Sequence, residues 1–182
     1  MAKKFDMAAD NRSRANLLAR LEPYWKMEAG NAIALPLLMF ALSKGQLGWV
    51  SLIPMSAMVM LLVIGALYWR GKVRQLRGKA HNSSRTLEVI DYLQERALVL
   101  TLTGCATAVA GWLVPGLAVG TADKIAASVS AVLALLEYIN YYHRQLQHFD
   151  NKADFRRLLA GKGFRQSWMA RDLAAWRAGR SA

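Results

Sequence analysis

An acidic residue interrupts an apolar stretch in the last third of the chain. The segment "IAASVSAVLALLEYINYY", residues 125–142, contains Glu137 as its single charged side chain. An ionised carboxylate exposed to hydrocarbon costs several kcal/mol, so such a group is protonated, paired or functional. Two interpretations follow. Either Glu137 locks helices together with Asn140 and Tyr141, which the absence of a second buried charge favours, or it carries a proton- or ion-linked role.

Small and polar side chains recur along one side of the same segment at steps of three and four residues. This stripe consists of Ser130, Ala134, Glu137, Tyr141, Arg144 and His148, with Asn140 beside it. Small residues let helices approach closely and polar ones hydrogen-bond across the gap. The stripe is therefore predicted to face the protein interior, opposite Gly104, Ala108 and Gly111.

The partners expected for Glu137 lie on other predicted helices at a similar depth. Thr101 and Thr103 follow the start of one apolar run, and Asn31 lies within another. Each offers a polar group that could hydrogen-bond to a carboxyl group between helices. Arg144, two turns away on the same face, is a further candidate.

The C-terminal segment has large apolar side chains at helical spacing. Its predicted face consists of Phe164, Trp168, Met169, Leu173 and Trp176. A basic helix with tryptophan on its apolar face suits a membrane surface. The alternative, which has equal support, is that this face packs against a cytoplasmic hairpin of the same chain or against a protein partner.

Catalytic chemistry finds little support in the sequence. The chain has three histidines, and the spacing of His143 and His148 does not place them on one helical face as a metal pair. There is no phosphate-binding glycine loop and no G-x-S-x-G motif. We therefore predict no catalytic residue, no metal site and no cofactor, and the single cysteine, Cys105, is expected to act as a small buried residue.

Long apolar runs dominate the rest of the 182-residue chain, which is 54% hydrophobic. About 20 apolar helical residues cross a hydrocarbon core of about 30 Å. Membrane spans are predicted at about 23–43, 47–69, 97–114 and 125–143. The predicted fold is an all-α integral membrane four-helix bundle with helical cytoplasmic extensions. These are an amphipathic segment at 1–22, a hairpin at 70–96 and a basic amphipathic tail at 150–182.

Basic residues fix the expected orientation. Of the 24 Lys and Arg residues, 22 fall in the two terminal segments and the 70–96 connection, and only Lys44 and Lys124 fall in the two short loops. Cytoplasmic segments are enriched in Lys and Arg, so both termini are predicted to be cytoplasmic. The alanine- and arginine-rich composition suggests a bacterial inner membrane.

The net charge of +12 lies mainly beside the predicted spans. Basic residues in such places are attracted to anionic lipid, so anionic lipid is the expected partner and nucleic acid is not. The leading hypothesis is a non-catalytic scaffold or accessory subunit that binds a protein partner or anionic lipid through its cytoplasmic helices. The alternatives are a small oligomeric channel or transporter that uses Glu137 and, third, an enzyme acting on lipid headgroups.

Overall fold

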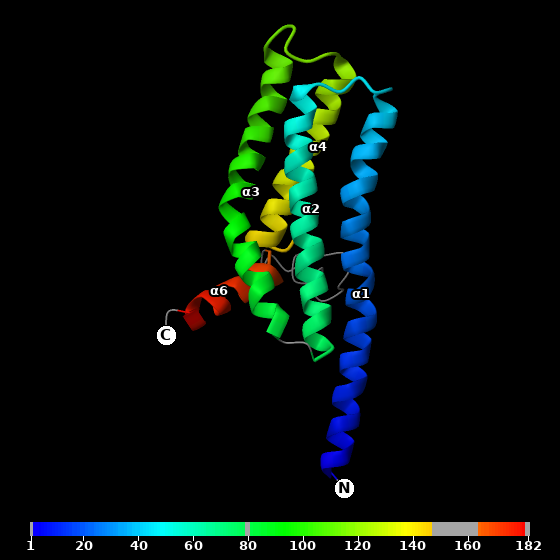
Figure 1. The fold of residues 1–182 in the computed structure, drawn as a ribbon, viewed down its shortest axis with the longest axis vertical. Helices are drawn as coiled ribbons and strands as arrows, with labels where there is room; N and C mark the ends of the chain where they lie inside the picture. Colours follow the sequence, from blue (N-terminus) through cyan, green and yellow to red (C-terminus); the bar gives the residue numbers. More distant parts are fainter. Residues whose placement is uncertain (1, 79–80, 147–163, 181–182) are drawn as a thin grey trace.

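The structure, a computed structural model, describes residues 2–78, 81–146 and 164–180, and there it is helical, without strands. The chain forms four long helices and a shorter one near its C-terminus. They are α1 (Ala2–Leu42), α2 (Trp49–Leu76), α3 (His81–Leu113), α4 (Thr121–Tyr142) and the shorter α6 (Trp168–Arg180). The long helices run side by side, and α6 lies across one end of them (Figure 1). The predicted all-α fold class is thus confirmed.

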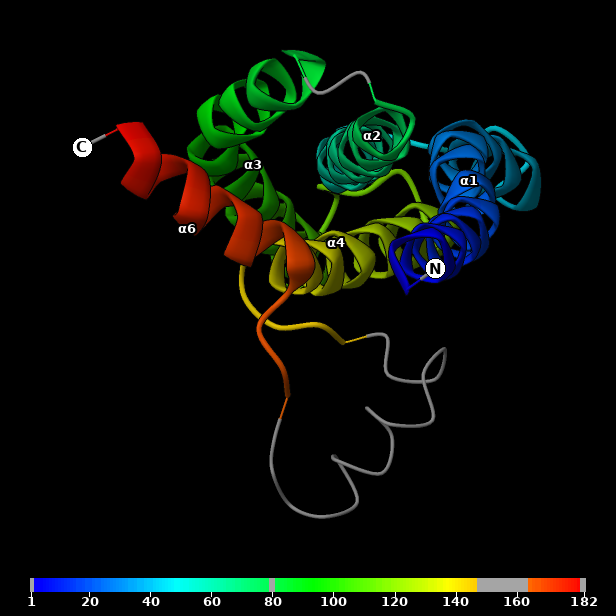
Figure 2. The same cartoon turned by 90° about the horizontal axis from the view of Figure 1, so that it is seen from below.

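The second helix is at the centre of the bundle because it packs against α1, α3 and α4. Its sequence is uncharged from Trp49 to Trp69, and Met58, Leu61 and Ile64 are fully buried. Seen along the bundle, α2 lies between α1 and α3 with α4 beside it, and α6 runs past the ends of α3 and α4 (Figure 2). The most uniformly apolar segment therefore supplies the core.

Glycines of α3 allow close packing, but against a different helix from the one predicted. A Cβ atom at Gly104 would lie 2.8 Å from Cα of Pro54, and one at Gly111 would lie 2.5 Å from Cγ1 of Val50. Both neighbours belong to α2, where a proline ring and a β-branched side chain fill the space that glycine leaves. Of the three small residues predicted to face α4, Ala108 is packed in a cluster that includes residues of that helix.

The first helix has no break at Pro23, where the sequence predicted the start of a span. It continues from Ala2 to Leu42 through both Pro23 and Pro36. A proline within a helix removes one backbone hydrogen bond and strains the preceding turn. The surrounding alanine, leucine, arginine and glutamate residues are strong helix formers, and the helix is maintained. The predicted segment 1–22 is thus the first part of a single long helix.

Two helical segments, Trp49–Leu76 and Ser84–Leu113, are long and apolar enough to cross a membrane. Core helices of soluble proteins can have the same length and composition, but they are mostly buried. The most apolar window of Ser84–Leu113 is only 28% buried, against 61% for that of Trp49–Leu76. Large apolar side chains are also exposed on all four long helices, among them Ile33, Leu37, Trp49, Val63, Val99, Val109, Val132 and Leu136.

Candidate functional site

Glu137 is half-buried on α4, and its contacts come mostly from its own helix. Asn140 Nδ2 donates to Glu137 Oε2 at 3.4 Å, and the Tyr141 side chain also interacts with this carboxyl group. None of the three predicted partners on other helices fills this role. Thr103 is exposed and donates to the Val99 carbonyl, the hydroxyl of Thr101 is buried without a partner, and Asn31 is half-buried.

A second acid, Glu28 of α1, approaches Glu137 from across the bundle. Glu28 is only 5% exposed, and its carboxyl group lies close enough to that of Glu137 for the two to repel when both are ionised. The sequence analysis did not single out Glu28, which lies near the start of the span predicted at about 23–43. Glu28 lies one helical turn before Asn31 in the same predicted span. This position was the signal that could have identified it as a partner of Glu137.

Tyr141 connects the two carboxyl groups. It is 4% exposed, and its hydroxyl interacts with both Glu28 and Glu137, yet no contact has the geometry of a full hydrogen bond. The ring reaches α2 at Gly65, where a Cβ atom would lie 2.2 Å from Tyr141 Oη. The glycine on α2 therefore makes the room in which the Tyr141 hydroxyl meets the two acids.

A cavity of about 40 Å³ adjoins this group. It is lined by Glu28, Tyr68, Trp69, Asn140, Tyr141, Gln145, Ser167, Trp168 and Met169. Gln145 Oε1 is buried in the same place without a hydrogen-bond partner, whereas Asn140 Oδ1 accepts from the backbone N–H of Leu146 at 2.9 Å. The cavity is thus bordered by one carboxyl group and by two oxygen atoms that are not satisfied by the described residues.

The predicted stripe on α4 is continuous only as far as the helix extends. Ser130 is buried with its hydroxyl 3.1 Å from Met39 Sδ of α1, and Ala134 is fully buried. The helix ends at Tyr142, so Arg144 lies beyond it, exposed, and donates to the Phe164 carbonyl at 3.2 Å. Arg144 therefore does not turn back toward Glu137, and His148 lies outside the described residues.

The apolar face predicted for the C-terminal segment is divided between the bundle and the outside. Met169 and Leu173 are each 2% exposed and belong to the main core cluster. Phe164 and Trp168 remain largely exposed, and Trp176 is half-buried. Met169 and Leu173 therefore pack against the rest of the chain, as one of the two alternatives predicted. The exposed aromatic rings remain accessible to lipid or to a protein partner.

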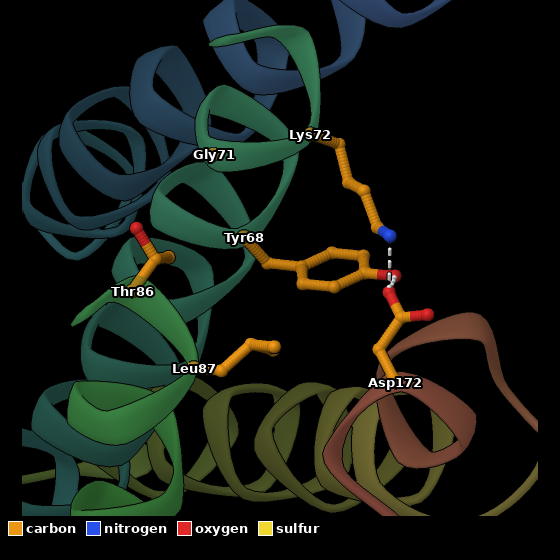
Figure 3. A pocket seen from close by; sticks show the side chains of 6 residues that line it. All are labelled: Tyr68, Gly71, Lys72, Thr86, Leu87 and Asp172. Carbon is orange, nitrogen blue, oxygen red and sulfur yellow. Dashed lines mark hydrogen bonds and ion pairs between the residues drawn. The ribbon is translucent and has the colours of Figure 1, made fainter. Parts of the chain in front are cut away.

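Polar contacts hold α6 on the bundle. Asp172 accepts a hydrogen bond from Tyr68 Oη at 2.7 Å and forms an ion pair with Lys72 Nζ at 2.6 Å, so both of these α2 side chains converge on one carboxylate (Figure 3). At the other end, Arg177 pairs with Asp91 and donates to Gln94 Oε1 at 2.6 Å on α3. We call these two sets of contacts the α6 latch.

The start of α6 is also fixed. Ser167 precedes the helix, and its hydroxyl accepts from the backbone N–H of Ala170 at 3.0 Å, as an N-cap does. The same hydroxyl donates to the Tyr141 carbonyl in the last turn of α4. The cap of α6 is thereby connected directly to the residue that lies between the two acids.

A third buried acid, Asp123, lies at the opposite end of the bundle. Its carboxylate accepts backbone hydrogen bonds from Gly48 at 2.9 Å and Val119 at 3.1 Å, and Ser51 contributes further bonds. Burial acts to raise the pKa of Asp123, but these donated hydrogen bonds outweigh it and hold the pKa below its ordinary value of 3.8. Asp123 therefore joins the α3–α4 loop to the start of α2. The sequence analysis did not single it out.

Comparison with models of protein families, with curated proteins and with solved structures yields no match to this chain.

Proposed function

We propose that this chain is an integral membrane protein with four spans, and that it acts as a non-catalytic scaffold or accessory subunit on the cytoplasmic face. The exposed apolar side chains on all four long helices support the membrane location. Such a surface is costly in water and favourable in lipid. The two membrane-length helices, α2 and α3, agree with it.

The arrangement of the chain ends supports the proposed orientation. Both short loops, after α1 and after α3, lie at one end of the bundle, and the N-terminus, the α2–α3 connection and α6 lie toward the other (Figure 1). The basic residues divide in the same way, with Lys44 and Lys124 at the loop end. The end that carries α6 is therefore proposed to be cytoplasmic.

The observation that carries the scaffold role is the docked α6 helix. The α6 latch fixes it to the bundle, while the Trp168 ring stays exposed with the Arg171 guanidinium stacked 4.1 Å from its centre. An aromatic and basic surface held beside a membrane suits anionic lipid headgroups or an acidic protein partner. Because α6 is held in place, such a surface needs little ordering on binding.

Topology is the first experimental test. A reporter fused at Ala182 should indicate the cytoplasm, and reporters inserted near Lys44 or Ala122 should indicate the opposite side. Reporters at Lys44 and Arg77 that lie on the same side would contradict the four-span proposal. For the scaffold role, W168A/R171Q should retain less co-purified anionic lipid or protein partner than wild type, whereas K44Q at the other end should not.

A small oligomeric channel or transporter remains the second candidate. The observation that favours it is the approach of Glu28 to Glu137 beside a cavity. Buried acids inside a helical bundle often belong to ion or proton pathways. A homo-oligomer that conducts ions in reconstituted vesicles would favour this candidate over the scaffold.

A further inference from the structure

The Glu28–Glu137 pair has no basic partner among the residues that the structure describes. No cation within the described part of the chain is among the groups that act on either carboxyl group, and three basic side chains of α1 and α2 have other partners: Lys26 pairs with Glu22, Lys72 pairs with Asp172, and Arg70 lies over the Trp25 ring. Two carboxylates that repel each other in a buried place need a compensating positive charge or must be neutralised. The pair thus lacks the ion-pair partner that a purely structural role would supply.

Two neutral oxygen atoms lie close to the Glu28–Glu137 pair. The Tyr141 hydroxyl lies between the two acids, almost fully buried and without a satisfied hydrogen bond, and Gln145 Oε1 is unpaired in the adjoining cavity. Buried polar atoms are nearly always satisfied in folded proteins. Two unsatisfied oxygens border one cavity, beside a carboxyl group. They therefore indicate a ligand that oxygen atoms coordinate through their lone pairs.

The chemistry of these donors selects the class of ligand. Carboxylate, amide and hydroxyl oxygens suit small hard cations, whereas softer metals prefer histidine and cysteine. No group of three or more His, Cys, Asp and Glu side chains occurs among the described residues, so neutral oxygens would have to complete any such shell. The cavity of about 40 Å³ has room for an ion and one or two water molecules.

We propose that a small hard metal cation binds at the edge of this cavity, where Glu28, Tyr141 and Gln145 line it and Glu137 approaches Glu28, with the oxygens of Tyr141 and Gln145 completing the coordination. Trp168 at the start of α6 borders the cavity, but the proposed ligands belong to α1, to α4 and to Gln145 after α4. Arg171 does not line the cavity, so R171Q should weaken lipid or partner binding without changing the response to metal, and this inference and the proposed scaffold function can fail separately.

The test uses the full chain, purified in detergent at neutral pH with choline chloride to hold ionic strength constant. Sodium chloride and calcium chloride are titrated separately, and the thermal unfolding midpoint is measured. A cation that binds only the folded state raises this midpoint in proportion to the logarithm of its concentration. We expect at least one of the two metals to give such a rise, and the arm that responds identifies the charge of the ion.

Matched variants locate the site. E28Q and E137Q should each reduce the metal-dependent rise by at least about half, because each removes a charged ligand. Y141F, which removes only the hydroxyl, should weaken the apparent metal affinity by a smaller factor. E95Q, at an exposed glutamate of α3, should respond to metal as wild type does.

Three results would overturn the proposal. One is the absence of any rise with either metal. Another is an undiminished rise in both E28Q and E137Q, since that would place the ion elsewhere. The third is stabilisation by lowered pH alone with no metal effect, which would identify the pair as two carboxyl groups that share a proton.

Discussion

The two ends of the bundle each contain acidic side chains, and these side chains differ in the hydrogen-bond donors that surround them. At the loop end, Asp123 is fully buried and its oxygens accept hydrogen bonds from backbone N–H groups at 2.9 and 3.1 Å. At the α6 end, Glu28 and Glu137 approach each other beside a cavity that Glu28 lines, and the tyrosine hydroxyl that interacts with both is unsatisfied.

This difference separates a structural acid from a candidate for function. A carboxylate that accepts several backbone N–H bonds replaces its lost hydration and stabilises the fold. An unpaired carboxylate gains nothing comparable and opposes folding while it is charged. Burial alone therefore does not identify a candidate site. Two neighbouring acids with few donors and no basic partner do.

The largest effect is expected from D123A. This variant leaves the N–H groups of Gly48 and Val119 without acceptors, at about 1–3 kcal/mol for each buried donor. We expect a loss of about 2–6 kcal/mol in the free energy of unfolding, measured by equilibrium unfolding in mixed micelles. T121A, at an exposed residue of the same helical turn, is the control. A D123A variant as stable as T121A would show that the loop end does not depend on this carboxylate.

A smaller effect is expected from acid. Because the pKa of Asp123 is lowered in the folded protein, its contribution to stability is present above its ordinary pKa of 3.8 and disappears as pH falls through the lower folded value. The unfolding free energy of wild type should therefore drop more steeply than that of D123N between about pH 6 and about pH 3. Parallel curves for the two proteins would contradict this assignment.

The smallest effect on stability is expected at the other end. In choline chloride without added metal, E28Q and E137Q should each change the unfolding free energy by less than about 1 kcal/mol, or increase it, because each removes an uncompensated charge. The amide oxygen of glutamine can still accept from Asn140 in E137Q. A loss as large as that of D123A would make this pair structural and remove the contrast between the two ends.

Much of the fold could be predicted from the chain because its cause is local. Apolar runs form helices, and α4 (Thr121–Tyr142) nearly coincides with the run at 125–143, whereas α2 extends to Leu76 and α3 begins at His81, well outside the uncharged runs at 47–69 and 97–114. The start of α1 could not be located, because Pro23 is compatible with the first turn of a helix and also with the interior of one.

The site was predictable only in part. The apolar surroundings of Glu137 identified it from sequence alone, and the helical spacing correctly associated it with Asn140 and Tyr141. Its second acid could not be found in this way. Glu28 lies more than a hundred positions earlier in the chain, and which face of α1 meets α4 depends on how both helices pack around α2.

Sequence by itself determined that the chain forms long apolar helices with basic ends, because helix formation and charge distribution depend on neighbouring residues. Only the tertiary structure decided which acidic side chains have hydrogen-bond donors and which do not. Asp123 meets the N–H groups of Gly48 and Val119 because the loops converge there. Glu28 approaches Glu137 beside the Tyr141 ring, for which Gly65 of the central helix leaves room. Whether a buried carboxylate is satisfied depends on donors that packing brings from distant parts of the chain, and no local pattern records them.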